Sequence, residues 1–192
     1  MIHVVLSEDE VELALWQAAH CSFGGVSRVR STDRSTTVHS DNVVGQLGQI
    51  ALHKYWHGHL LWYGVGRHRQ NQTPLQGDGG EDLLGTNVDV KTSVMRAGSD
   101  PTRYNLLVRP AERHDCWVYV LALIEPDWED ALPPTVLLAG WYNDEDLPKP
   151  EPLGPFRGAC KVPVAKLHPL PPVQYHHQIL IPSATEVECG SS

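Results

Sequence analysis

Residues 77–93 read GDGGEDLLGTNVDVKTS, and this stretch decides the fold that the sequence predicts. Turn-forming residues at 85–87 separate two apolar segments, residues 83–84 and 88–94. An apolar segment on each side of a short turn that contains glycine is typical of a β-hairpin. We therefore expect a hairpin here, and its second strand carries alternating apolar and polar side chains.

The polar side chains of this hairpin are expected to meet at one place. Residues two apart on a strand point to the same face, so Asp89 and Lys91 project together, while Val88 and Val90 project the other way. Folding the hairpin brings Asp82 back beside Asp89. Two carboxylates suit Mg²⁺ or Mn²⁺. A lysine beside the metal can orient or activate a water that attacks a phosphodiester. The alternative is a surface hairpin whose charged side chains are simply solvated.

Composition predicts one domain. The chain has 192 residues, 41% of them hydrophobic, which fits a single globular domain over residues 1–192 with a flexible tail from residue 183. No apolar run reaches the roughly 18 residues that a membrane-spanning helix needs, and the first residues lack the basic region of a signal peptide. Four cysteines far apart in the chain favour a reduced, cytoplasmic setting over a disulfide framework.

Charge is distributed unevenly along the chain, whose net charge is −8. Residues 24–113 contain eleven Lys and Arg against eight Asp and Glu, a net +3. Residues 114–192 contain four against eleven, a net −7. The first half therefore permits contact with nucleic acid. Its basic segment at residues 26–40 can lie along phosphates or be an ordinary solvated loop.

The remaining pattern alternates helical and extended segments. A capping box, Ser7 with Glu10 three residues on, predicts a helix over residues 7–21. The apolar run at residues 117–124 is unbroken, as in a strand buried on both faces. Other apolar segments predict strands at residues 60–65, 104–108, 135–141 and 178–181, and an extended segment or short helix at 162–167.

A second helix is predicted over residues 43–57, capped by Asp41 or Asn42. Gly45 and Gly48 lower its helix propensity. We expect that they occur here because glycine allows the helix to approach the sheet closely.

Histidines near the end of this helix offer an alternative site. His53 and His57 are four apart on one helix face, a spacing that can bind zinc, and His59 and His68 are near them in the sequence. No H-E-x-x-H glutamate and no nearby cysteine accompanies them, so a polar helix surface or DNA-facing side chains are the preferred interpretation.

The order of these motifs resembles that of the PD-(D/E)XK nuclease superfamily, which has the restriction-endonuclease-like fold. Asp82, followed by two leucines, stands where the family has its first aspartate, and the triplet DVK at residues 89–91 matches the (D/E)-x-K signature. Residues 44–51, VGQLGQIA, resemble the upstream helix, which often reads G-x-x-G-E-x-A. The later strands and the KVPVAKL run at residues 161–167 are similar to the family's distal segments.

The resemblance covers about residues 43–170 and implies an α/β (α+β) fold of αβββαβ type. Its core would be restriction-endonuclease-like, a central mixed β-sheet flanked by helices. The resemblance also implies a Mg²⁺-dependent deoxyribonuclease, an endonuclease related to restriction or phage enzymes, that hydrolyses DNA phosphodiester bonds. A homodimer is compatible with it, because restriction-like enzymes often dimerise so that each active site cuts one strand.

Residue roles follow from the same resemblance. Asp82, Asp89 and the backbone carbonyl of Val90 are expected to bind Mg²⁺ or Mn²⁺, and Lys91 to position or activate the attacking water. Gln49 stands where the family has an acid, and its amide offers a carbonyl oxygen to the water but no charge. Candidates for contact with DNA are Tyr104 and seven arginines: Arg28, Arg30, Arg34, Arg67, Arg69, Arg96 and Arg103.

Two interpretations from other classes stay open. A nuclease-like fold that only binds DNA or a protein partner is favoured by Gln49 and by the acidic net charge. The histidine zinc site is the other.

Overall fold

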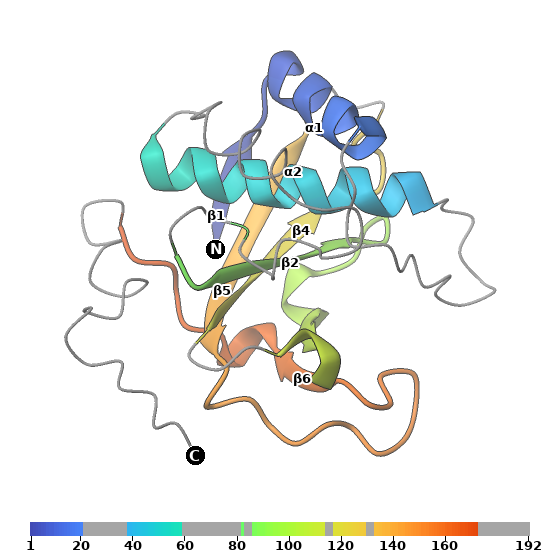
Figure 1. Cartoon of the computed structure of the whole chain (residues 1–192), viewed down its shortest axis with the longest axis vertical. Helices are drawn as coiled ribbons and strands as arrows, with labels where there is room; N and C mark the ends of the chain where they lie inside the picture. Colours follow the sequence, from blue (N-terminus) through green and yellow to red (C-terminus); the bar gives the residue numbers. More distant parts are fainter. Residues whose placement is uncertain (21–37, 59–81, 83–85, 114–116, 130–132, 173–192) are drawn as a thin grey trace.

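The computed structural model describes residues 1–20, 38–58, 82, 86–113, 117–129 and 133–172 (Figure 1). The helices are α1, Glu8–His20, and α2, Val38–His57. The strands are β1, Ile2–Val5; β2, Val88–Val94; β3, Asn105–Val108; β4, Val118–Ile124; β5, Thr135–Asn143; and β6, Cys160–Pro163. Short 3-10 turns occupy Pro101–Arg103, Pro110–Glu112 and Val164–Lys166.

The fold is α+β, with a mixed four-stranded sheet in the order β1-β5-β4-β2. β2 runs parallel to β4, with Asp89 beside Tyr119 and Lys91 beside Leu121. The pairs β4–β5 and β1–β5 are antiparallel. β3 and β6 form a separate antiparallel pair. Among the described strands, β2 therefore lies at an edge of the main sheet.

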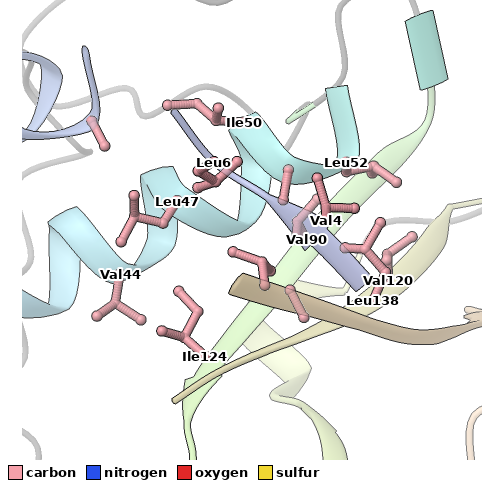
Figure 2. Packing of buried hydrophobic residues seen from close by; sticks show 14 of the residues in the cluster. Val4, Leu6, Val44, Leu47, Ile50, Leu52, Val90, Val120, Ile124 and Leu138 are labelled. Atoms are coloured by element: carbon pink, nitrogen blue, oxygen red, sulfur yellow. The ribbon is translucent and has the colours of Figure 1, made fainter. Parts of the chain in front are cut away.

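The two described helices lie on the same side of the main sheet (Figure 1). α2 contacts β2, β4 and β5, and α1 packs on α2. The apolar face of α2 carries Val44, Leu47 and Ile50, which pack with Val90 and Val120 of the sheet (Figure 2). Every residue of β4 is buried, as its unbroken apolar run predicts.

The other face of the sheet is covered differently from the expectation of flanking helices. Leu106 and Val108 of β3 and Val162 of β6 share a buried cluster with Leu121 and Leu123 of β4. In the described part of the chain, a small two-stranded sheet takes the place of a helix layer here. The described helices therefore cover one face of the sheet, and on the other face the period-two apolar residues of β3 and β6 are buried against β4.

The helix starts differ in how well local sequence predicts them. The capping box of α1 is confirmed: the Ser7 N–H donates to Glu10 Oε2 at 2.7 Å, and the Glu10 N–H donates to Ser7 Oγ at 3.3 Å. α2 instead begins at Val38, earlier than the predicted caps Asp41 and Asn42. Asp41 lies in the first turn, where a carboxylate interacts favourably with the helix dipole without acting as the cap.

Gly48 explains how α2 approaches β2. A Cβ at this position would lie 2.0 Å from Thr92 Oγ1, so only glycine fits without movement. Gly45 has no atom within 4 Å of such a Cβ, so the expectation that both glycines serve close approach is wrong for Gly45.

The strand β1 was not predicted. Its alternating Ile2 and Val4 face the core, and it pairs with β5, more than 120 residues later in the chain. The predicted strands at residues 60–65 and 178–181, the first hairpin strand at 83–84 and the tail from residue 183 lie outside the described residues. No described helix has the length and apolar character needed to cross a bilayer.

Candidate active site

Asp89 and Lys91 lie side by side on β2, on the face of the sheet opposite α2. Val88 and Val90, which alternate with them, are buried in the core cluster that α2 covers. Lys91 Nζ lies 2.8 Å from Asp89 Oδ2. The Asp89 residue is 4% exposed and the Lys91 side chain 24% exposed, so this ion pair is largely shielded from water.

Asp82 lies along the outer edge of the same strand. Its N–H donates to the Val88 carbonyl at 2.8 Å, and its Oδ2 accepts from the Val90 N–H at 2.7 Å. In a strand the N–H and C=O of one residue point to the same side. The Val90 carbonyl therefore faces the edge that Asp82 occupies. The expected return of Asp82 toward β2 agrees with these two hydrogen bonds.

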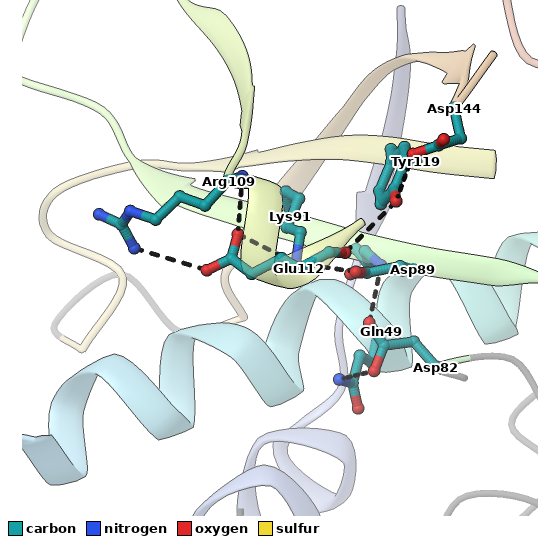
Figure 3. Close-up of polar contacts among 9 residues, drawn as sticks. Gln49, Asp82, Asp89, Lys91, Arg109, Glu112, Tyr119 and Asp144 are labelled. Atoms are coloured by element: carbon teal, nitrogen blue, oxygen red, sulfur yellow. Dashed lines mark hydrogen bonds and ion pairs between the residues drawn. The ribbon is translucent and has the colours of Figure 1, made fainter. Parts of the chain in front are cut away.

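Gln49 reaches this edge from α2. Its Nε2 donates to Asp82 Oδ1 (Figure 3). Its Oε1 accepts from Gln46 Nε2 at 3.0 Å. Gly48, the preceding residue, is where α2 approaches Thr92 of β2 closely. In this structure the amide of Gln49 orients Asp82, and its oxygen faces Gln46.

Glu112 is a functional candidate that sequence reasoning missed. Its Oε2 lies 3.6 Å from Lys91 Nζ, on the 3-10 turn Pro110–Glu112 that follows β3. Burial favours the neutral amine, but the charges of Asp89, Glu112 and Asp82 outweigh it and raise the pKa of Lys91. No local motif marks Glu112, because its proximity to Lys91 depends on how the chain returns after β2.

Two of the seven candidate arginines, Arg96 and Arg103, belong to the described residues, and both are exposed on the loop that follows β2. Tyr104 is half-buried and builds this loop: its hydroxyl oxygen accepts from the Arg96 N–H at 2.6 Å and lies 2.8 Å from Ser99 Oγ. The other candidates, Arg28, Arg30, Arg34, Arg67 and Arg69, lie outside the described residues.

The histidines do not form a zinc site within the described residues. His53 is buried, and its ring contacts that of His57 with centroids 4.5 Å apart. His59 and His68 lie outside the described part of the chain. Across residues that the structure describes, no group of three or more His, Cys, Asp or Glu side chains is arranged to bind a metal.

The carboxylates of Asp82 and Asp89 still fit Mg²⁺ by their chemistry. Both are hard oxygen donors, and Mg²⁺ in proteins is commonly bound through one or two carboxylates while it keeps several waters. Each carboxylate already has a partner in the protein, Gln49 for Asp82 and Lys91 for Asp89. A bound cation would therefore share these oxygens with the existing hydrogen bonds.

No protein-family model, curated protein or solved structure matches the chain. Functional inference therefore depends on the geometry of the site.

Proposed function

We propose that the protein is a Mg²⁺-dependent deoxyribonuclease, an endonuclease of the PD-(D/E)XK type with a restriction-endonuclease-like core. One observation carries the proposal: Asp82, Asp89, Lys91 and Gln49, from three separate segments, converge at the edge strand β2. Two carboxylates that can bind a divalent cation and an ammonium that can stabilise negative charge suit metal-assisted hydrolysis of a phosphodiester.

The cation would be bound by Asp82 and Asp89, with the Val90 carbonyl on the same edge as Asp82. When bound, Mg²⁺ supplies a Lewis acid that polarises a phosphate oxygen and stabilises the developing negative charge. Gln49 supports this arrangement by fixing the orientation of Asp82. Its neutral amide adds no charge, which would leave the site with fewer negative ligands than an acid at the same position.

Lys91 acts in its protonated form. In the protein without a bound cation, the surrounding carboxylates raise the pKa of Lys91, and the amine carries a proton at neutral pH. An ammonium donates hydrogen bonds and does not accept a proton. Lys91 therefore orients the attacking water or a phosphate oxygen and stabilises the negative charge of the transition state. Its shielded position strengthens this interaction relative to the same contact in bulk water.

A second candidate function is a nuclease-like module that binds DNA or a protein partner without cutting. The observation in its favour is that the site's side chains already satisfy one another, Gln49 with Asp82 and Lys91 with Asp89. Within this candidate, the net charge of −8 opposes close contact with DNA and favours a protein partner.

A cleavage assay separates the two candidates. Supercoiled plasmid and linear DNA are incubated with the protein and Mg²⁺, with and without EDTA, and binding is measured in parallel by fluorescence anisotropy. A nuclease cuts with Mg²⁺ and stops with EDTA, and the Asp82→Asn variant cuts at least about 100-fold more slowly. The exposed Lys166→Ala variant is the matched control and cuts as the wild type does. Binding without any cutting supports the module.

A further inference from the structure

The Lys91 ammonium forms ion pairs with two carboxylates, Asp89 and Glu112, and of these only Asp89 belongs to the proposed cation site. Asp89 Oδ2 lies 2.8 Å from its ammonium, and Glu112 Oε2 lies 3.6 Å from it (Figure 3). The nitrogen therefore lies between a carboxylate on its own strand and a carboxylate on a turn about twenty residues later in the sequence. The Glu112 side chain is 28% exposed, so it too is partly shielded.

Glu112 is itself held by the side chain and the backbone N–H of Arg109. Its Oε1 accepts from Arg109 Nη1 at 3.4 Å, and its Oε2 accepts from the Arg109 N–H at 3.3 Å. Both carboxylate oxygens thus have partners on the same turn. A glutamate constrained at both oxygens presents one of them to Lys91 in a defined direction.

The turn that carries Glu112 is anchored to the end of the main sheet. Arg113 forms a two-pronged ion pair with the buried Asp144, with Nε–Oδ1 and Nη2–Oδ2 distances of 3.0 and 2.7 Å. The Tyr119 hydroxyl donates to Asp144 Oδ1 at 2.9 Å and lies 3.3 Å from the Glu112 carbonyl oxygen. Tyr119 is the residue of β4 that pairs with Asp89 of β2. The same strand register therefore places both carboxylates around Lys91.

We propose that Glu112 is a positioning residue that fixes the Lys91 ammonium for DNA cleavage while Asp89 is engaged by the catalytic cation. This inference rests on the proposed nuclease function. A lysine side chain has four rotatable bonds and loses rotamer entropy when it is fixed. With Asp89 shared between the cation and Lys91, Glu112 supplies a contact that the cation does not compete for. Arg109 and the Arg113–Asp144–Tyr119 network fix Glu112 in turn.

The test compares Glu112→Gln with Glu125→Gln, a glutamate exposed just beyond β4, in the full-length protein. Glu112→Gln is expected to lower kcat roughly 10- to 100-fold, as for other residues that orient a catalytic group, with the KM for DNA unchanged. Glu125→Gln keeps wild-type kcat. In a Lys91→Ala background, Glu112→Gln causes no further loss, because its effect passes through Lys91. A purely structural role would lower activity in both backgrounds.

The outcomes separate this inference from the proposed function. If the wild type cuts and Lys91→Ala cuts measurably but more slowly, while Glu112→Gln retains wild-type kcat, the role of Glu112 is overturned and the nuclease stands. If the wild type does not cut DNA, the proposed function fails first. A readout without activity is the ¹⁵N signal of the Lys91 ammonium: exchange of its protons with water should be faster in Glu112→Gln than in the wild type or in Glu125→Gln, and equal rates in all three would overturn the contact.

Discussion

Replacing Lys91 with methionine removes an ammonium from a largely buried carboxylate while keeping a side chain of similar length. Asp89 is 4% exposed and loses its partner at 2.8 Å. Removing one member of a buried ion pair costs about 3–5 kcal/mol of unfolding free energy. The lower end applies here, because a quarter of the Lys91 side chain is exposed and water reaches the pair. We expect Lys91→Met to lose about 3 kcal/mol.

Replacing Asp89, the other member of the pair, should cost less unfolding free energy. In Asp89→Ala the ammonium keeps Glu112 at 3.6 Å and its contact with water, so a loss of about 1 kcal/mol is expected. In the double variant Asp89→Ala/Lys91→Met neither charge is left behind. Removing both members of a buried pair is often nearly neutral, so the double variant should be more stable than Lys91→Met alone.

Urea unfolding followed by circular dichroism measures all three variants. With an m value of about 2 kcal/mol/M, a loss of 3 kcal/mol lowers the urea midpoint by about 1.5 M. The reasoning is refuted if Lys91→Met is as stable as Asp89→Ala, or if the double variant loses the sum of the two single losses.

Three further predictions concern the scaffold and pH. Gly48→Ala should lose about 1–2 kcal/mol of unfolding free energy, because the clash with Thr92 exceeds the roughly 1 kcal/mol of helix propensity gained. Gly45→Ala has open space and should gain up to about 1 kcal/mol. Thermal melts compare the two variants, and equal shifts in melting temperature would contradict the close approach at Gly48. Ser7→Ala should cost about 1 kcal/mol through loss of the capping box, seen in urea midpoints, and an unchanged midpoint would show that the cap does not stabilise α1. The pKa of Lys91 is raised in the folded state, so its contribution to stability is fully present below the unfolded-state pKa of about 10.4 and is lost as pH rises through the folded-state pKa. The wild type should therefore lose more stability than Lys91→Met between pH 9 and pH 12. Parallel curves of stability against pH for the two proteins would argue against the raised pKa.

Features set by local sequence could be predicted. The capping box of α1 involves residues three apart, and seven consecutive apolar residues predict the burial of β4. The shared face of Asp89 and Lys91 follows from the period of a strand, which does not depend on the rest of the chain.

Features set by long-range pairing could not. β1 pairs with β5 across most of the chain, and its four residues carry only a weak alternation. The strand at residues 104–108 was predicted, but its pairing with β6 over one face of the main sheet was not. Glu112 lies beside Lys91 on a turn that Arg113 ties to Asp144, the residue after β5, and no spacing in the sequence reveals that connection.

The central claim is that the side chains gathered at the edge of β2 form a cation-dependent centre for DNA cleavage. The most direct test is the rate at which supercoiled plasmid is cut in Mg²⁺ by the wild type and by Asp89→Asn, which keeps the shape of the side chain and leaves Lys91 beside Glu112. We predict cutting by the wild type and a rate at least about 100-fold lower for Asp89→Asn, as expected when a cation ligand that supports several kcal/mol of transition-state stabilisation is lost. Equal rates for the two proteins, or no cutting by either, would contradict the claim.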